Sequence, residues 1–172
     1  LMGLVSDGGV HSQMTHLIAA VRVITAAGVP VAIHAITDGR DVAPKSADVF
    51  IASLQNELPD GAFIATVSGR YFALDRDNRW DRVSMAYGAM VSAEGEVSAN
   101  AELAVSQAYA RDETDEFIKP TVLDGYKGMT AADGVFMLNY RADRAREILE
   151  AIGNPDFNGF ARGAAPALAA RL

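Results

Sequence analysis

The arginines of this chain are unevenly distributed, and four of the twelve fall within thirteen residues, at Arg70, Arg76, Arg79 and Arg82. A guanidinium group stays charged at any working pH and offers a carboxylate or a phosphate two parallel donors, whereas lysine offers a point charge. The apolar run 62–67 before this loop is typical of a buried strand, and a helix is expected to begin near Trp80. Because ligands of open α/β sheets bind at the carboxyl ends of strands, this position favours an anion-binding loop over an ordinary solvated helix flank.

Arg141 and Arg144 form a second cationic cluster, directly after the apolar run 134–140 that predicts the last strand. The two residues are three apart at the start of an expected helix that ends near Ile152, so we expect them to share one face. Free N–H groups and the helix dipole attract anions to this end of a helix. The alternative is that both arginines only solvate the helix end, where positive charge is unfavourable without a ligand.

Asp41, next to Arg40, is a candidate general base, and its alternative role is a structural carboxylate that pairs with a neighbour. If Asp41 acts chemically, the adjacent Arg40 and the surrounding guanidinium groups are expected to keep it ionised. His11 and His16 are five residues apart without a nearby carboxylate triad, which argues against a metal site, and His34 is predicted to be a core or sheet-face histidine. No P-loop, Gly-x-Ser-x-Gly elbow or complete dinucleotide-binding glycine motif is present, so no nucleophile is evident.

Apolar runs alternate with helical patterns along the chain, which predicts a parallel sheet with right-handed crossovers. The fold class we expect is α/β, a three-layer αβα domain with a mostly parallel sheet. Polar loops follow the predicted strands, and in a parallel sheet these loops are expected to converge on one edge. The expected strands lie at 1–5, 31–36, 62–67 and 134–140, with an extended segment at 117–123, and the expected helices at about 14–24, 47–54, 80–91, 99–110 and 141–152.

The composition of the chain limits the classes of protein to which it can belong. At 172 residues, half of them hydrophobic, the chain can bury the core of one domain. A net charge of −7 argues against nucleic acids and anionic membranes as partners, because both bind basic surfaces. No apolar run approaches the roughly 20 residues of a membrane span, and the first residues do not form a signal peptide. The absence of cysteine excludes disulfides and thiolate chemistry, and we expect a cytoplasmic monomer.

The ends of the chain suggest a piece of a longer protein. Residues 1–5 read as a strand that runs directly into a loop, and natural domains seldom begin this way, so we expect a missing upstream element. Residues 1–153 are predicted to form one domain. Residues 154–172 are rich in Gly, Ala and Pro and are predicted to be a linker or tail toward a domain that is missing from this chain.

Five ordered blocks are distributed along most of the chain: Ser6-Asp-Gly-Gly-Val-His-Ser12, Asp38-Gly-Arg-Asp41, Val67-Ser-Gly-Arg-Tyr71 with the aspartates and arginines of 75–82, Asp115-Glu-Phe117 with Lys119-Pro-Thr121, and Arg141-Ala-Asp-Arg144. In this order they resemble the cofactor-independent (2,3-bisphosphoglycerate-independent) phosphoglycerate mutase family. Five ordered blocks are far more specific than any single motif. What they resemble is the phosphotransferase domain, which that family inserts into a metal-binding domain similar to alkaline phosphatase.

The resemblance implies that residues 1–153 are the substrate-binding, phosphotransferase domain of a glycolytic isomerase. That enzyme interconverts 3-phosphoglycerate and 2-phosphoglycerate through a phosphoserine on the separate domain, which would also bind two manganese ions. No metal is expected in this chain, and without the serine the chain alone is predicted to be inactive. Asp41 would be the acid–base catalyst. The implied substrate contacts are His11, Arg40, Asp41, Arg70, Arg76, Arg141 and Arg144.

One position departs from the family pattern, because Gln13 stands where many members carry a second histidine after His11. A proton-donating role is therefore not expected there. Two alternatives of other classes stay open: a non-catalytic doubly wound module that binds a sugar phosphate or a nucleotide, and a structural fragment without affinity. A nucleotide site would need an adenine cleft and a ribose-binding acid after a glycine-rich turn, and neither is found. Titration with phosphoglycerate and with a nucleotide distinguishes the three.

Overall fold

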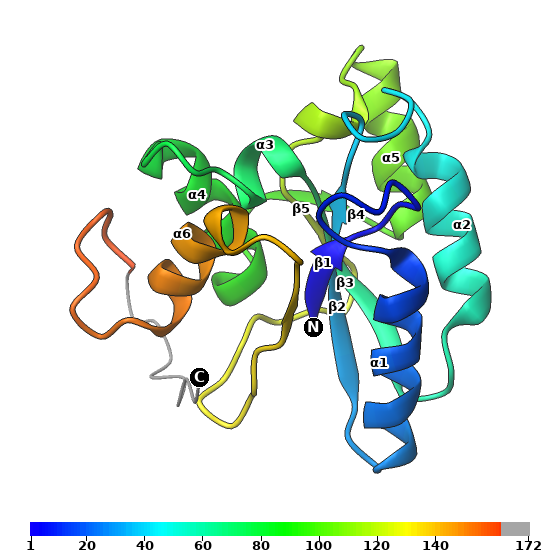
Figure 1. The fold of residues 1–172 in the computed structure, drawn as a ribbon, viewed down its shortest axis with the longest axis horizontal. Coiled ribbons are helices and arrows are strands. Elements are labelled where there is room, and N and C mark those ends of the chain that lie inside the picture. The colour runs from blue at the N-terminus through cyan, green and yellow to red at the C-terminus, as the bar shows by residue number, and fades with distance from the viewer. Residues whose placement is uncertain (163–172) are drawn as a thin grey trace.

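A six-stranded sheet with helices on both faces forms the centre of this protein in the computed structural model, which describes residues 1–162 (Figure 1). The strand order is β4-β5-β3-β2-β1-β6. Strands β1, β2, β3 and β6 are parallel to one another, β5 is antiparallel to β3, and β4 runs parallel to β5. The predicted α/β class with a mostly parallel sheet is therefore confirmed. The strands are β1 (Met2–Leu4), β2 (Val31–Thr37), β3 (Ala62–Gly69), β4 (Glu96–Ser98), β5 (Thr121–Leu123) and β6 (Met137–Leu138).

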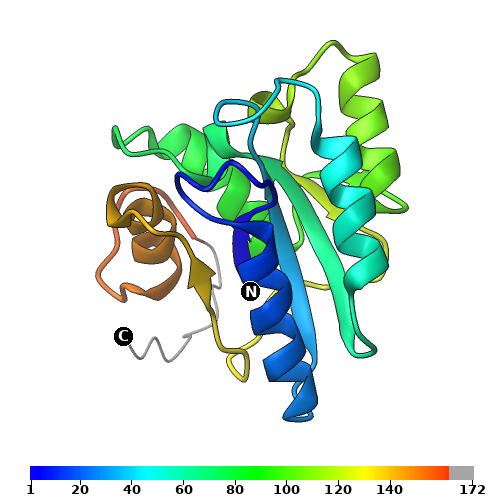
Figure 2. The same cartoon turned by 45° about the vertical axis from the view of Figure 1, so that its right-hand side comes forward.

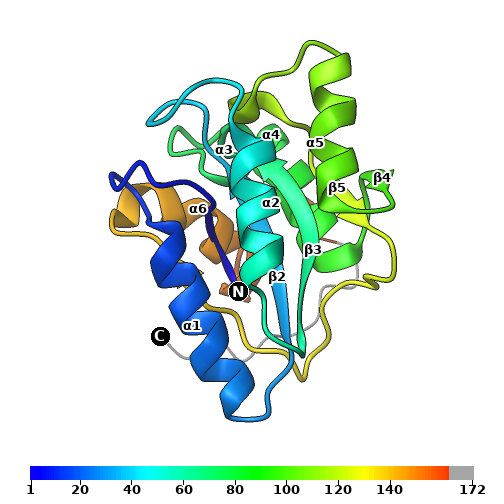
Figure 3. The same ribbon diagram turned by 90° about the vertical axis from the view of Figure 1, so that its right-hand side faces the viewer.

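Two groups of helices cover the two faces of the sheet, as Figure 2 shows from an oblique side. Figure 3 turns the face with α1 and α2 toward the viewer. That face carries α1 (Met14–Ala26), α2 (Ala47–Glu57) and α5 (Ala101–Ala110). The other face carries α3 (Arg70–Ala73), α4 (Trp80–Tyr87) with a π-helical turn at Gly88–Ser92, and α6 (Ala142–Gly153). A 3₁₀ turn spans Asp115–Phe117. None of the helices in residues 1–162 combines the length and the apolar character that crossing a membrane requires.

The alternation of side chains along β2 explains why both faces need a cover. Ile33 and Ala35 are fully buried against the α1 and α2 side, whereas Ile36 is fully buried on the α4 and α6 side. His34 is buried as predicted, with its Nδ1 3.0 Å from Thr66 Oγ1. Burial lowers the pKa of His34 to about 3, so this histidine is a neutral member of the core.

One prediction about the second half of the chain needs correction, and two short elements of the fold were not predicted. The last strand was expected over 134–140, but β6 covers only Met137–Leu138. Its sole partner β1 is three residues long and pairs only through Met2 and Gly3, so no further ladder is available. The short strand β4 and the single-turn helix α3 have too few residues to show a period in the sequence. Both depend on contacts with distant segments.

The segment after α6 packs back onto the domain as far as it is described. The Phe157 ring meets Trp80 of α4 edge to face, with centroids 5.1 Å apart. Arg162 donates to the carbonyl oxygens of Ala151 and Asn154 at the end of α6. A linker or tail was predicted at 154–172. Residues 163–172 of that range lie outside the described residues.

The parallel strands bring four polar loops to one end of the sheet. β1, β2, β3 and β6 all point the same way, so the loops that follow them start at the same edge (Figure 1). Chain order runs from β1 through β2 to β3 on one side of β1, and β6 lies on its other side. This reversal is a topological switch point, where open α/β sheets bind their ligands.

Candidate anion-binding site

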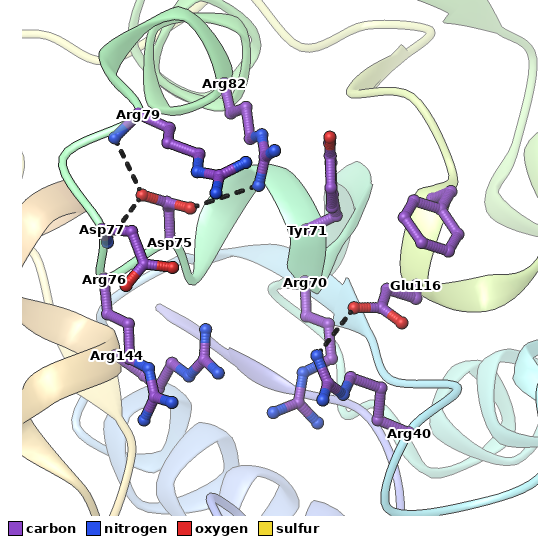
Figure 4. Close-up of a pocket in the computed structure, with 11 residues that line it drawn as sticks. Arg40, Arg70, Tyr71, Asp75, Arg76, Asp77, Arg79, Arg82, Glu116 and Arg144 are labelled. Carbon is purple, nitrogen blue, oxygen red and sulfur yellow. Dashed lines mark hydrogen bonds and ion pairs between the residues drawn. The ribbon is translucent and has the colours of Figure 1, made fainter.

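A pocket of about 420 Å³ opens at this end of the sheet. Six arginines and three carboxylates line it, which leaves an excess of positive charge. Figure 4 shows Arg76 and Arg144 on one side of the pocket and Arg40 and Arg70 on the other. The lining residues are Arg40, Arg70, Tyr71, Asp75, Arg76, Asp77, Arg79, Arg82, Glu116, Phe117 and Arg144. A concave surface of this charge is suited to an anionic ligand.

Asp38, directly after β2, organises the floor of the site. Its Oδ2 accepts a 2.7 Å hydrogen bond from Ser6 Oγ, and its Oδ1 accepts the backbone N–H groups of Arg40 and Asp41. The carboxyl group is buried, and burial alone would raise its pKa. The donors of Ser6, Asp41 and Arg70 outweigh that effect and hold the pKa of Asp38 below its usual range. Asp38 is thus an ionised acceptor that shapes the 38–41 turn.

Arg70 joins β3 to this turn. Its Nη1 donates to Asp38 Oδ1 at 2.5 Å and to Asp41 Oδ2 at 2.8 Å. The side chain is only 4% exposed, and although burial opposes the charged form, the two carboxylates raise the pKa of Arg70. Gly69 permits this arrangement, because a Cβ there would lie 2.2 Å from the Glu116 carbonyl oxygen. Any larger residue would push Arg70 and the 3₁₀ turn apart.

Asp41 pairs with Arg70 and not with its sequence neighbour. Arg40 turns away and donates to Glu116 Oε1 at 3.3 Å, so the ion-pair partner of Asp41 is Arg70. The loop after β1 passes close by, because a Cβ at Gly8 would lie 2.9 Å from Asp41 Cβ. Asp41 therefore lies between its own loop and the loop after β1, and one of its carboxylate oxygens accepts from the guanidinium group of Arg70.

His11 lies on the same side as Asp41 and has an unused nitrogen. The side chain is 5% exposed, and its Nδ1 finds no hydrogen-bond partner among residues 1–162. Burial lowers the pKa of His11, the charge of Arg70 lowers it further, and Asp41 opposes both. His16 instead shares a 2.8 Å hydrogen bond with the Tyr140 hydroxyl, away from His11. His11 is not among the residues that line the pocket, and its free nitrogen is buried.

The arginines between Asp75 and Arg82 differ in their exposure and in their partners. Arg82 lies over the Tyr71 ring, 3.8 Å from its centroid, and contacts Asp75 at 3.5 Å. Arg79 and Arg76 are exposed, and Arg76 pairs with Asp143 of α6 at 3.1 Å. Arg82 is therefore held by its neighbours, while Arg76 has only an exposed partner.

Arg141 and Arg144 do not share one face of a helix. Arg141 is the exposed N-cap of α6 with extended backbone angles, whereas Arg144 lies in the first turn, lines the pocket and donates to the Leu74 carbonyl oxygen at 3.0 Å. Burial lowers the pKa of Arg144, and the nearby guanidinium groups of Arg76 and Arg70 lower it further. The charges of Arg141 and Arg144 both lower the pKa of His11, so both arginines lie near that side chain.

Several residues at the site were not identified individually from the sequence. Asp38 was seen only as part of a motif, although a carboxylate directly after a strand is a recognisable signal. Glu147 lies three residues after Arg144 and so on the same helix face, which its spacing could have shown. Asp75 and Glu116 gave no such signal, because their partners are distant in sequence or are backbone N–H groups.

The described residues do not form a metal site. Within 1–162, no three His, Asp or Glu side chains are grouped so that they could hold an ion. The carboxylates of the pocket are instead occupied by guanidinium groups and backbone N–H groups, as Asp38 and Asp75 show.

Comparisons with known proteins agree on one family. The family model described as "BPG-independent PGAM N-terminus" matches residues 1–171. The 2,3-bisphosphoglycerate-independent phosphoglycerate mutases of Ruegeria pomeroyi and Dinoroseobacter shibae are 63% and 60% identical over 172 residues, all of this chain and 34% of each relative. A crystal structure of the Leishmania mexicana phosphoglycerate mutase at low cobalt concentration superposes with a TM-score of 0.85 at 30% identity, over 97% of this chain and 33% of that one. The chain thus spans about a third of the length of the relatives it matches.

Proposed function

This chain belongs to the family of BPG-independent phosphoglycerate mutases, whose N-terminal region it matches, and on that premise we propose that it is the substrate-binding, phosphotransferase domain of such an enzyme. The reaction is the interconversion of 3-phosphoglycerate and 2-phosphoglycerate. The phosphoryl group would pass through a serine on the part of the protein that lies outside this chain.

One observation carries the proposal: the arginine-lined pocket at the carboxyl ends of the parallel strands. Phosphoglycerate carries a carboxylate at one end and a phosphate, so it needs several guanidinium groups in one small pocket. Charge-assisted bidentate pairs with arginine give both strength and orientation. Guanidinium groups also neutralise the oxygens of a transferring phosphoryl group, which is the main demand of phosphoryl transfer.

We divide the substrate between two arginine clusters that come from different loops of the chain. We assign the non-transferred part to Arg70 and Arg76, and the phosphoryl group to Arg141 and Arg144 on α6, which would face the other domain. His11 offers its free Nδ1 to a hydroxyl or phosphate oxygen. Arg40 completes the substrate contacts at the rim, where its exposed guanidinium can exchange Glu116 for the ligand.

Asp41 is assigned the proton transfers. A glycerate hydroxyl must lose its proton as it accepts the phosphoryl group and regain it in the reverse step, and one carboxylate can serve both directions. Arg70 holds Asp41 in place from one side. The remaining Asp41 oxygen is the atom that we expect to face the substrate hydroxyls.

The test is Asp41→Asn in the full-length enzyme. Because general acid–base catalysis contributes about 10²–10⁴-fold, kcat should fall by that order while KM and the melting temperature change little. Asp7→Asn, on the exposed neighbouring loop, is the matched control. A near-normal kcat with a raised KM would remove Asp41 from the chemistry and leave it as a holder of Arg70.

No group of side chains within residues 1–162 could hold a metal ion, so no step of our proposal runs through a metal here. The two manganese ions implied by the family resemblance would be bound, together with the serine, by the other part of the protein. The chain by itself should therefore bind phosphoglycerate without isomerising it, with or without manganese. Turnover by a purified sample free of host mutase would contradict this. Titration with a nucleotide in place of phosphoglycerate tests the alternative that the chain is a nucleotide-binding module.

A further inference from the structure

The arginine loop, residues 75–79, turns over the buried carboxyl group of Asp75. The backbone N–H groups of Asp77 and Arg79 both donate to Asp75 Oδ2 at 3.0 Å. Asn78 between them has a φ of 56°, a left-handed conformation that asparagine adopts more readily than most residues other than glycine. A local carboxylate thus sets the shape of the loop that presents the exposed arginines.

Glu147 of α6 accepts a hydrogen bond from the third backbone N–H group of this turn. Its Oε1 accepts from the Asn78 backbone at 2.9 Å, between the two donors that Asp75 uses. One helical turn earlier, Arg144 donates to the Leu74 carbonyl oxygen at 3.0 Å. Helix α6 is therefore bonded to the chain on both sides of Asp75. The same contacts hold Arg144, the residue of α6 that lines the pocket, next to the loop.

The remaining oxygen of Glu147 is the unusual feature. Glu147 is 6% exposed and Asp75 is 4% exposed, yet Glu147 Oε2 has no donor among residues 1–162. Two buried neighbouring carboxylates would repel each other, and one shared proton removes both the repulsion and the missing hydrogen bond. The other charged groups facing the pair are Asp77, which adds negative charge, and Arg82, which contacts Asp75 Oδ1 at 3.5 Å.

The electrostatics place that proton on Glu147. Burial raises the pKa of Glu147, and the nearby Asp75 raises it further, although the Asn78 N–H group opposes both. Burial acts in the same direction on Asp75, but the N–H groups of Arg79 and Asp77 outweigh it and lower the pKa of Asp75. Glu147 can then donate to Asp75 while it accepts from Asn78.

We propose that protonated Glu147 is a positioning residue that holds the arginine loop against α6, so that anion binding in the pocket weakens as Glu147 loses its proton to solvent. The inference rests on the proposed function for its ligand. The sign follows from the raised pKa of Glu147: the contact is fully present in acid and is lost as the pH rises through the folded-state value. Ionised Glu147 repels Asp75, releases the turn and adds negative charge near the pocket.

The experiment measures binding of 3-phosphoglycerate to this chain by calorimetry, from acidic to mildly alkaline pH. Glu147→Gln keeps the acceptor for Asn78 and supplies a permanent donor to Asp75, whereas Glu147→Ala removes both. Because His11 and the phosphate also titrate, the readout is the ratio of wild-type to variant affinity at each pH. We expect Glu147→Gln to bind like wild type in acid and more tightly at alkaline pH. Glu147→Ala should bind about tenfold more weakly in acid.

Glu150→Gln, an exposed change on the same helix, is the control and should reproduce the wild-type profile. If wild type binds but Glu147→Gln follows the same profile, the inference is wrong and the proposed function stands. If wild type does not bind, the proposed function is wrong, and exchange of the Asn78 amide hydrogen decides the inference separately. Protection in wild type and in Glu147→Gln, with faster exchange in Glu147→Ala, supports it. Equal exchange in all three overturns it.

Discussion

Two regions of the site handle positive charge in opposite ways. In the buried network of Ser6, Asp38, Asp41 and Arg70, one guanidinium nitrogen meets two carboxylates at 2.5 and 2.8 Å. On the arginine loop, Arg76 has one partner, Asp143, and both side chains are about half exposed. The first region is complete without a ligand, while the second has positive charge that a ligand can use.

The difference follows from the dielectric surroundings of the two regions. A buried ion pair is costly to break, because the remaining partner is left as an uncompensated charge. An exposed pair is screened by water and contributes little, so a carboxylate can be exchanged for a ligand oxygen at small cost. We infer that Arg70 positions Asp41 in addition to its proposed substrate contact, and that Arg76 and Arg144 contribute more to the free energy of binding.

Breaking the buried network should give the largest effect. Asp38→Ala leaves Arg70 with Asp41 alone and removes the acceptor of two backbone N–H groups. Its free energy of unfolding should fall by about 3–5 kcal/mol, as measured by denaturant unfolding. Asp7→Asn on the exposed loop after β1 should stay within about 0.5 kcal/mol of wild type. Equal stability of Asp38→Ala and wild type would mean that the network is not what holds the site together.

Arg76→Ala should separate binding from stability. Removing a charge-assisted contact is expected to cost about 1.5–3 kcal/mol of binding free energy for phosphoglycerate, with little change in melting temperature because the residue is exposed. Calorimetric titration and a melting curve on the same sample check both parts. Unchanged KM and kcat for this variant in the full-length enzyme would show that the exposed arginines do not contact the substrate.

Arg82→Lys examines the boundary between the two regions. Arg82 stacks on Tyr71 and contacts Asp75, and lysine keeps the charge but loses the planar stacking surface. The free energy of unfolding should fall by about 0.5–1 kcal/mol with a small change in affinity. A loss as large as that of Asp38→Ala would place Arg82 in the buried network.

Asp143→Asn should have the smallest effect on the fold. The change frees Arg76 from its exposed partner, so the melting temperature should not change measurably and phosphoglycerate should bind slightly more tightly. Titration against wild type provides the comparison. Weaker binding would indicate that Asp143 orients Arg76 and that the pair works as a unit.

Local patterns predicted much of this architecture. Helical spacing of apolar residues located α1, α2 and α5, and continuous apolar runs located β1, β2 and β3. The parallel order of those strands then required the loops to meet at one edge, where Arg40, Arg70, Arg76 and Arg144 now line one pocket. The five motif blocks indicated the family that the comparisons show.

Other features depend on partners that are distant in the sequence. The sequence suggested that Arg40 and other guanidinium groups surround Asp41, but only the strand ends identify Arg70 as its partner, across 29 positions. The length of β6 was set by its short partner β1, and the role of Glu147 by an N–H group 69 positions away.

The sequence by itself thus determined most of the strands and helices and the family, and it indicated the anionic ligand that we propose, because side-chain periodicity and charge are local properties. Only the tertiary structure decided which arginines are already paired and which can accept a ligand. Burial and pairing depend on every group that surrounds a charge, and most of those groups come from other segments of the chain.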